Sequence, residues 1–149
     1  VEEREAADAN IRAAYDFLVT AGAPRIGSLG WCFGGGWSLN TAQLFPDDLA
    51  ATVIYYGQVT ADEDRLRPIG APILGLFGAE DTGITVDSVQ AFRGALERLR
   101  KEHEIHVYPG VGHAFANPTG TNYNAEAATD AWEKTLEFLG RHLESDEES

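Results

Sequence analysis

Residues 30–36, Gly-Trp-Cys-Phe-Gly-Gly-Gly, are the most informative stretch of the sequence, because they place a cysteine in a glycine-rich turn. The apolar run before this turn, Arg25 to Trp31, is typical of a buried strand, and residues 33–44 have helical spacing that Pro46 ends. A Gly-x-Cys-x-Gly sequence at a sharp strand-to-helix turn is the cysteine form of the nucleophile elbow. We expect glycine two residues on either side of Cys32 to prevent collisions with neighbouring backbone.

Two other interpretations of this glycine-rich stretch compete with the elbow, a phosphate-binding loop and simple tight packing. A dinucleotide-binding loop needs Gly-x-Gly-x-x-Gly and an acidic residue at the end of the next strand, but that strand ends in Tyr55-Tyr56-Gly57. A P-loop needs Gly-Lys followed by Ser or Thr, which the sequence lacks. The elbow is therefore favoured over a phosphate loop, and tight packing stays open from this stretch alone.

Strand-like and helical segments alternate on both sides of the elbow. Apolar, strand-like runs cover residues 25–31, 51–56, 72–77 and 104–108, and helical spacing covers residues 3–20, 33–44, 86–101 and 126–142. This alternation predicts an α/β fold with about four parallel strands and helices on both faces of the sheet. Ligands of such sheets bind beyond the carboxyl ends of the strands. The loops after Trp31, Gly57, Gly78 and Pro109 are therefore expected to form one rim.

The length and composition indicate one ordinary globular domain. The chain has 149 residues, of which 44% are hydrophobic and 23% charged. We predict a single domain over residues 1–143 and a disordered acidic tail over residues 144–149. No apolar run approaches the roughly 18 residues of a membrane-spanning helix, and the acidic N-terminal stretch does not resemble a signal peptide. The expected location is therefore the cytoplasm, with no membrane partner.

The charge balance and the cysteine count exclude several classes of function. The chain carries 24 acidic against 11 basic residues, which gives a formal net charge of −13. Nucleic acids and anionic membranes attract basic patches, so we expect neither as a partner. The single cysteine allows no internal disulfide and no CxxC zinc site. His103 and His106 have His-x-x-His spacing, but a strand would place them on opposite faces, so we expect no metal.

Two further loops at the predicted rim supply the groups that would activate a nucleophilic cysteine. Asp81 follows the third strand, and His113 lies in a glycine-flanked loop after the fourth. The order nucleophile, acid, histidine along the chain is that of hydrolases built on this type of sheet. We expect His113 to take the thiol proton of Cys32 and Asp81 to orient the imidazole and stabilise its cation.

Aromatic residues near the rim are candidates for the walls of a substrate pocket. The backbone N–H of Phe33 would donate to the oxyanion, and Trp31, Tyr56 and Phe115 would wall an acyl pocket. Packing is the competing interpretation for each of these side chains. Trp37 and Trp132 fall within predicted helices and are assigned to packing.

The motifs together resemble a known family of enzymes. GWCFGGGW at residues 30–37, ATVIYYG at 51–57, GAED at 78–81 and YPGVGHAFAN at 108–117 resemble the dienelactone hydrolases, or carboxymethylenebutenolidases, of the α/β-hydrolase superfamily. The resemblance implies a Cys32–Asp81–His113 triad and hydrolysis of small esters or lactones through an acyl-cysteine, without a cofactor. Members that act on carboxylated lactones have an arginine where this chain has Asn117. A carboxylated lactone is therefore not the expected substrate.

In the family that the motifs resemble, the first strands and the loop that donates a second oxyanion N–H come before the helix expected here at residues 3–20, and this sequence lacks that part. The chain is either a naturally short, truncated α/β-hydrolase or a fragment of a longer one. Without those strands, the edge at Arg25 to Trp31 is open, and we expect a homodimer that pairs two such edges. The alternative function is a catalytically weak remnant that serves as a binding or assembly module.

Overall fold

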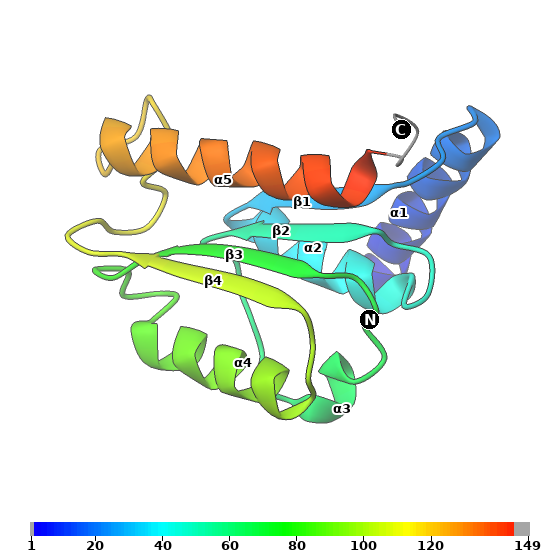
Figure 1. Ribbon diagram of the computed structural model, residues 1–149, viewed down its shortest axis with the longest axis horizontal. Helices are drawn as coiled ribbons and strands as arrows, with labels where there is room; N and C mark the ends of the chain where they lie inside the picture. Colours follow the sequence, from blue (N-terminus) through cyan, green and yellow to red (C-terminus); the bar gives the residue numbers. More distant parts are fainter. Residues whose placement is uncertain (1, 145–149) are drawn as a thin grey trace.

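Four parallel strands form the centre of the fold. The computed structural model describes residues 2–144, and it places β1 (Gly27–Trp31), β2 (Ala51–Tyr55), β3 (Ile73–Gly78) and β4 (His103–Tyr108) in the spatial order β1-β2-β3-β4 (Figure 1). All neighbouring pairs are parallel. The predicted fold class is confirmed, and the predicted strand bounds differ from the observed ones by one or two residues.

Helices cover both faces of this sheet. They are α1 (Glu2–Thr20), α2 (Phe33–Leu44), α3 (Glu63–Leu66), α4 (Val86–Arg98) and α5 (Ala125–Leu143). Figure 1 shows α5 along one face of the sheet and α3 and α4 along the other. Helix α2 packs on β1 and β2, and α1 lies outside α2, where the rings of Tyr15 and Phe45 stack 4.0 Å apart. The sequence did not predict α3.

The core forms two layers, one on each face of the sheet. All five residues of β2 are buried, and their side chains alternate between the layers. Ile54 packs with side chains of α2 and α4, such as Leu39 and Phe92, whereas Val53 packs with α5 residues such as Phe138. A strand covered on both faces has no polar side, which explains the continuous apolar run at residues 51–56.

Strand β1 lies at one edge of the sheet, as the sequence predicts. Within residues 2–144, β1 pairs only with β2. Cys32 N–H donates to Tyr55 O, and Ala50 N–H donates to Ile26 O, so the even-numbered residues of this stretch face β2. The backbone groups of Gly27, Leu29 and Trp31 therefore point to the open edge.

The structure does not test two of the predictions, the single domain and the disordered tail. The division into one domain stays a prediction, and residues 145–149 of the predicted tail lie outside the described part. Within the described part, no helix combines the length and the apolar character needed to cross a bilayer.

Candidate active site

The turn between β1 and α2 has the strained backbone expected of an elbow. Cys32 has φ 56° and ψ −120°, a left-handed φ that a residue with a side chain rarely adopts. A Cβ atom at Gly30 would lie 2.0 Å from the carbonyl oxygen of Gly34, so only glycine fits at position 30. The expectation that Gly34 prevents a collision is wrong, because a Cβ atom at this position would meet nothing within 4 Å. Gly35 has that role instead, since its Cβ would lie 2.8 Å from Tyr55 O.

The structure brings the side chains of Cys32 and His113 together. The Sγ atom of Cys32 lies 3.1 Å from Nε2 of His113, although 81 positions separate the two residues in the sequence. Cys32 is exposed, so a small molecule from solvent can reach its sulfur. The two groups are therefore within proton-transfer distance at an accessible surface.

Asp81 completes the chain of hydrogen bonds from the other side of the imidazole. Its Oδ2 atom lies 2.7 Å from Nδ1 of His113, and its side chain is only 1% exposed. The other oxygen, Oδ1, accepts backbone N–H bonds from Gly83 and Ile84, each 2.9 Å long. Because both carboxylate oxygens have fixed partners, Asp81 can hold the imidazole with its Nε2 atom toward Cys32.

The loops that carry Asp81 and His113 lie against each other after β3 and β4. A Cβ at Gly78 would lie 2.5 Å from the carbonyl oxygen of Val111, so this contact requires glycine. Glu80 N–H donates to the same carbonyl over 2.9 Å, and Asn122 Nδ2 donates to His113 O over 2.9 Å. The backbone thus fixes the distance between the acid and the histidine.

The contacts of Cys32 and His113 shift their pKa values in opposite directions. The hydrogen bond with His113 lowers the pKa of the Cys32 thiol, and the Phe33 backbone N–H adds to this against a smaller effect of burial. Burial acts to lower the pKa of His113, but hydrogen bonds with Cys32 and Asp81 outweigh it and raise that pKa. Both shifts favour a thiolate beside an imidazolium.

A cavity of about 310 Å³ opens beside the sulfur. It is lined by Trp31, Cys32, Tyr56, Ala114, Ala116 and Asn117. Trp31 and Tyr56 thus lie where a substrate pocket was expected. The sequence singled out Asn117 but neither alanine, because a short apolar side chain in a loop gives no functional signal.

The side chains of Phe115, which was expected to wall the pocket, and of Phe33, whose expected role concerns its backbone N–H, do not line this cavity. The ring of Phe115 is fully buried and packs 5.3 Å from the ring of Tyr56, so it supports the wall from behind. Tyr56 also lies edge-on to the His113 ring at 5.3 Å, and burial raises the pKa of Tyr56 to about 12. The Phe33 side chain is 78% exposed and lines a different pocket, described below.

Metal-binding groups do not gather around this cavity in the part of the chain that the structure describes. Across residues 2–144, the His, Cys, Asp and Glu side chains form no group of three that could hold a metal ion. His103 contacts the carbonyl oxygen of Lys101, whereas His106 lies 3.8 Å from Glu104. The two histidines of the His-x-x-His pattern therefore have separate surroundings.

The chain is similar to proteins of one known family. The family model described as "Dienelactone hydrolase family" matches residues 1–143. A Saccharolobus solfataricus protein named as a proposed carboxymethylenebutenolidase is 38% identical over 128 residues, which cover 86% of this chain and 49% of that protein. A protein of the same name from Escherichia coli strain K12 is 36% identical over 76% of this chain and 45% of its own length. The chain thus spans about half the length of the curated relatives it matches.

Solved structures show the same relationship. A protein of Klebsiella pneumoniae named as a proposed dienelactone hydrolase is 33% identical, with a TM-score of 0.70 over 76% of this chain and 50% of that one. The structure called "m3DLH" has a TM-score of 0.82 over 96% of this chain and 64% of that one, and its 24% identity supports the fold alone. The four-stranded sheet therefore corresponds to part of an α/β-hydrolase fold. From the family-model match and the relatives above 30% identity, this chain belongs to the dienelactone hydrolase family.

Proposed function

We propose that the protein hydrolyses small carboxylic esters or lactones, with Cys32 as the nucleophile of a Cys32–His113–Asp81 triad. One observation carries the proposal, the hydrogen-bonded chain in which Cys32 Sγ lies 3.1 Å from His113 and His113 lies 2.7 Å from Asp81. Membership of the dienelactone hydrolase family supports the same reaction class. The lowered pKa of Cys32 supports attack by sulfur.

In the proposed reaction the thiolate of Cys32 attacks the substrate carbonyl carbon, and His113 holds the thiol proton. The backbone N–H of Phe33, at the start of α2, stabilises the oxyanion that forms on the carbonyl oxygen. As the C–O bond breaks, His113 gives its proton to the leaving alkoxide, and a thioester remains on Cys32. His113 then takes a proton from water as the water oxygen attacks the thioester carbon. The C–S bond breaks, the carboxylic acid leaves, and His113 returns the proton to the sulfur of Cys32.

The cavity beside Cys32 supports a small, uncharged acyl group. Its walls include Trp31 and two alanines, and its volume is about 310 Å³, at the lower end of ordinary ligand pockets. Asn117 supplies an amide where a carboxylate would require a cation. We therefore expect short neutral esters and lactones to react faster than carboxylated ones.

The proposal is tested by the hydrolysis of p-nitrophenyl acetate. We expect wild-type protein to turn this ester over, and both Cys32→Ala and His113→Ala to have no activity above buffer. His103→Ala is the matched control, because that histidine lies on β4 and contacts Lys101, so its activity should equal wild type. Equal rates for Cys32→Ala and wild type would contradict the proposal, and a folded but inactive wild type would support the alternative of a binding or assembly module.

Association through β1 and a cytoplasmic location are the remaining parts of the proposal. The backbone groups of Gly27, Leu29 and Trp31 point away from β2. None of these residues is charged or a proline, which supports the pairing of this edge with another strand. Two β1 edges paired antiparallel about a two-fold axis would form one sheet of eight strands. The cytoplasm keeps a free thiol such as Cys32 reduced, as a nucleophilic cysteine requires.

A further inference from the structure

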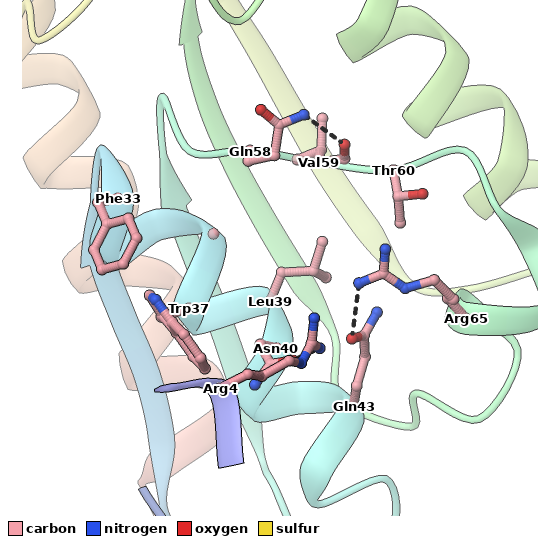
Figure 2. Close-up of a pocket in the computed structure, with 11 residues that line it drawn as sticks. Arg4, Phe33, Trp37, Leu39, Asn40, Gln43, Gln58, Val59, Thr60 and Arg65 are labelled. Atoms are coloured by element: carbon pink, nitrogen blue, oxygen red, sulfur yellow. Dashed lines mark hydrogen bonds between the residues drawn. The ribbon is translucent and has the colours of Figure 1, made fainter. Parts of the chain in front are cut away.

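A second pocket is lined by residues of α2 and of the segment that follows β2. Its volume is about 220 Å³, and it shares no lining residue with the cavity that contains Cys32. In Figure 2, Phe33 and Trp37 of α2 lie on one side, residues 58–60 cross the top, and Arg65 lies opposite. The lining consists of Arg4, Phe33, Gly36, Trp37, Leu39, Asn40, Gln43, Gln58, Val59, Thr60 and Arg65.

The charge of this pocket is opposite to that of the chain. Its lining holds two of the 11 basic residues, Arg4 and Arg65, and none of the 24 acidic ones. In the part of the chain that the structure describes, neither arginine forms an ion pair, whereas Arg67 and Arg98 pair with carboxylates of α3. Two unneutralised guanidinium groups in a net-acidic protein favour an anion at this place.

The hydrogen bonds of Gln43 also leave a donor available. Its Oε1 atom accepts a long, 3.4 Å bond from Arg65, which can only donate, so the amide NH₂ faces away from Arg65. That Nε2 atom is buried and makes no hydrogen bond with any residue from 2 to 144. Arg4 donates to Asn40 Oδ1 over 2.6 Å, and Asn40 donates in turn to Asp8, which lies outside the lining. A buried amide donor without an acceptor is costly, and a ligand oxygen would remove that cost.

The opposite side of the pocket is aromatic. The rings of Phe33 and Trp37 meet edge to face with centroids 6.1 Å apart, and Leu39 adds an aliphatic surface. Phe33 is far more exposed than an aromatic residue assigned only to packing would be. These rings offer a flat ligand an apolar contact on the side of the pocket opposite Arg65.

We propose that this pocket binds a small aromatic carboxylate, with the ring against Phe33 and Trp37 and the carboxylate near Arg65 and Gln43. Ligand pockets of ordinary size measure about 300–1,000 Å³, so a volume of about 220 Å³ suits a single ring. The site is separate from Cys32, so ligand binding does not depend on the proposed reaction.

The test is titration of the full chain with benzoate, followed by NMR of the Trp37 indole N–H. We expect saturable shifts with benzoate, much weaker binding of benzamide, which lacks the charge, and of acetate, which lacks the ring. Arg65→Gln should weaken benzoate binding about fivefold, because an exposed ion pair contributes modestly. The matched control is Arg67→Gln, two residues away and directed to Asp64, which should bind as wild type does.

Two further variants separate binding from folding and from catalysis. Gln43→Leu removes the unpartnered donor at similar volume, so the protein should fold at least as stably and bind benzoate more weakly. Cys32→Ala should bind benzoate as wild type does, even if no ester is hydrolysed. Equal affinity for benzoate and benzamide, or no loss of affinity in either Arg65→Gln or Gln43→Leu, would overturn the proposal.

Discussion

Asp81 Oδ2 lies 2.7 Å from Nδ1 of His113, although the two residues are 32 positions apart in the sequence. The contact follows from the parallel register of β3 and β4, which pairs Gly78 with Tyr108 at the end of both strands. Beyond that pair, Ala79 N–H donates to Tyr108 O over 2.9 Å, so the two loops continue the ladder for one more step. The sheet itself therefore positions the acid next to the histidine.

Substitution of Asp81 is expected to reduce ester hydrolysis less than substitution of His113. Asparagine keeps an oxygen for the backbone N–H groups of Gly83 and Ile84 but no longer stabilises the imidazolium. We expect Asp81→Asn to lower kcat by about 10²–10⁴-fold and His113→Ala to leave no measurable rate. Steady-state kinetics with p-nitrophenyl acetate measures both, and an Asp81→Asn rate equal to wild type would contradict the assigned role.

Alkylation of Cys32 is expected to persist at lower pH than for an ordinary thiol. Only the thiolate reacts, and the hydrogen bond with His113 lowers the thiol pKa, so the midpoint of the rate profile moves to the acid side of about 8.5. The rate of iodoacetamide labelling measured from about pH 5 to about pH 9 gives that midpoint. His113→Ala should move the labelling midpoint back toward the ordinary thiol pKa of about 8.5. A wild-type midpoint at that ordinary value would show that Cys32 is not activated.

Two glycines of the elbow should respond in opposite ways to substitution by alanine. A Cβ at Gly30 would lie 2.0 Å from Gly34 O, so Gly30→Ala should destabilise the fold by about 1–3 kcal/mol or more. A Cβ at Gly34 in α2 meets nothing within 4 Å, and alanine is the better helix former, so Gly34→Ala should be neutral or stabilising. Urea unfolding of both variants measures the difference, and similar midpoints would contradict the close approach of Gly30 to Gly34 O.

The open edge of β1 predicts self-association. Within residues 2–144 the strand has one partner strand, and its outward backbone groups lack hydrogen bonds from the sheet. We expect light scattering to report a dimer at micromolar concentration that dissociates on dilution. A well-folded monomer throughout the dilution series would contradict the pairing, and higher aggregates would contradict the two-fold geometry.

The sequence predicts the sheet well, and it also predicts that the three candidate residues follow strand ends, because both depend on local signals. The glycines around Cys32, the apolar run at residues 51–56 and the glycine-flanked His113 mark strand ends without reference to distant residues. Helix α3 (Glu63–Leu66) is not predicted, because four residues are too few to show a helical period. Its beginning is marked only by Asp62, whose side chain accepts from Asp64 N–H and which also suits a turn.

Features that depend on contacts between distant segments cannot be predicted in this way. The helical position of Trp37 is visible in the sequence and favours packing, whereas the approach of Arg4 and Arg65 to the same pocket is not visible there. The depth of Phe115 behind Tyr56 likewise depends on how the loop after β4 folds back. The second glycine that the elbow requires is Gly35 and not Gly34, since the closest backbone belongs to β2.

The most direct test of Cys32 as the nucleophile is to trap the acyl group on the protein. Wild-type protein is mixed with p-nitrophenyl acetate, quenched in acid within the first turnover and digested, and the peptide that contains Cys32 is analysed by mass spectrometry. We predict one acetyl group on Cys32, present transiently in wild type and absent from Cys32→Ala and His113→Ala. Hydrolysis at the wild-type rate with no acetyl group on Cys32 at any time would contradict the proposed mechanism.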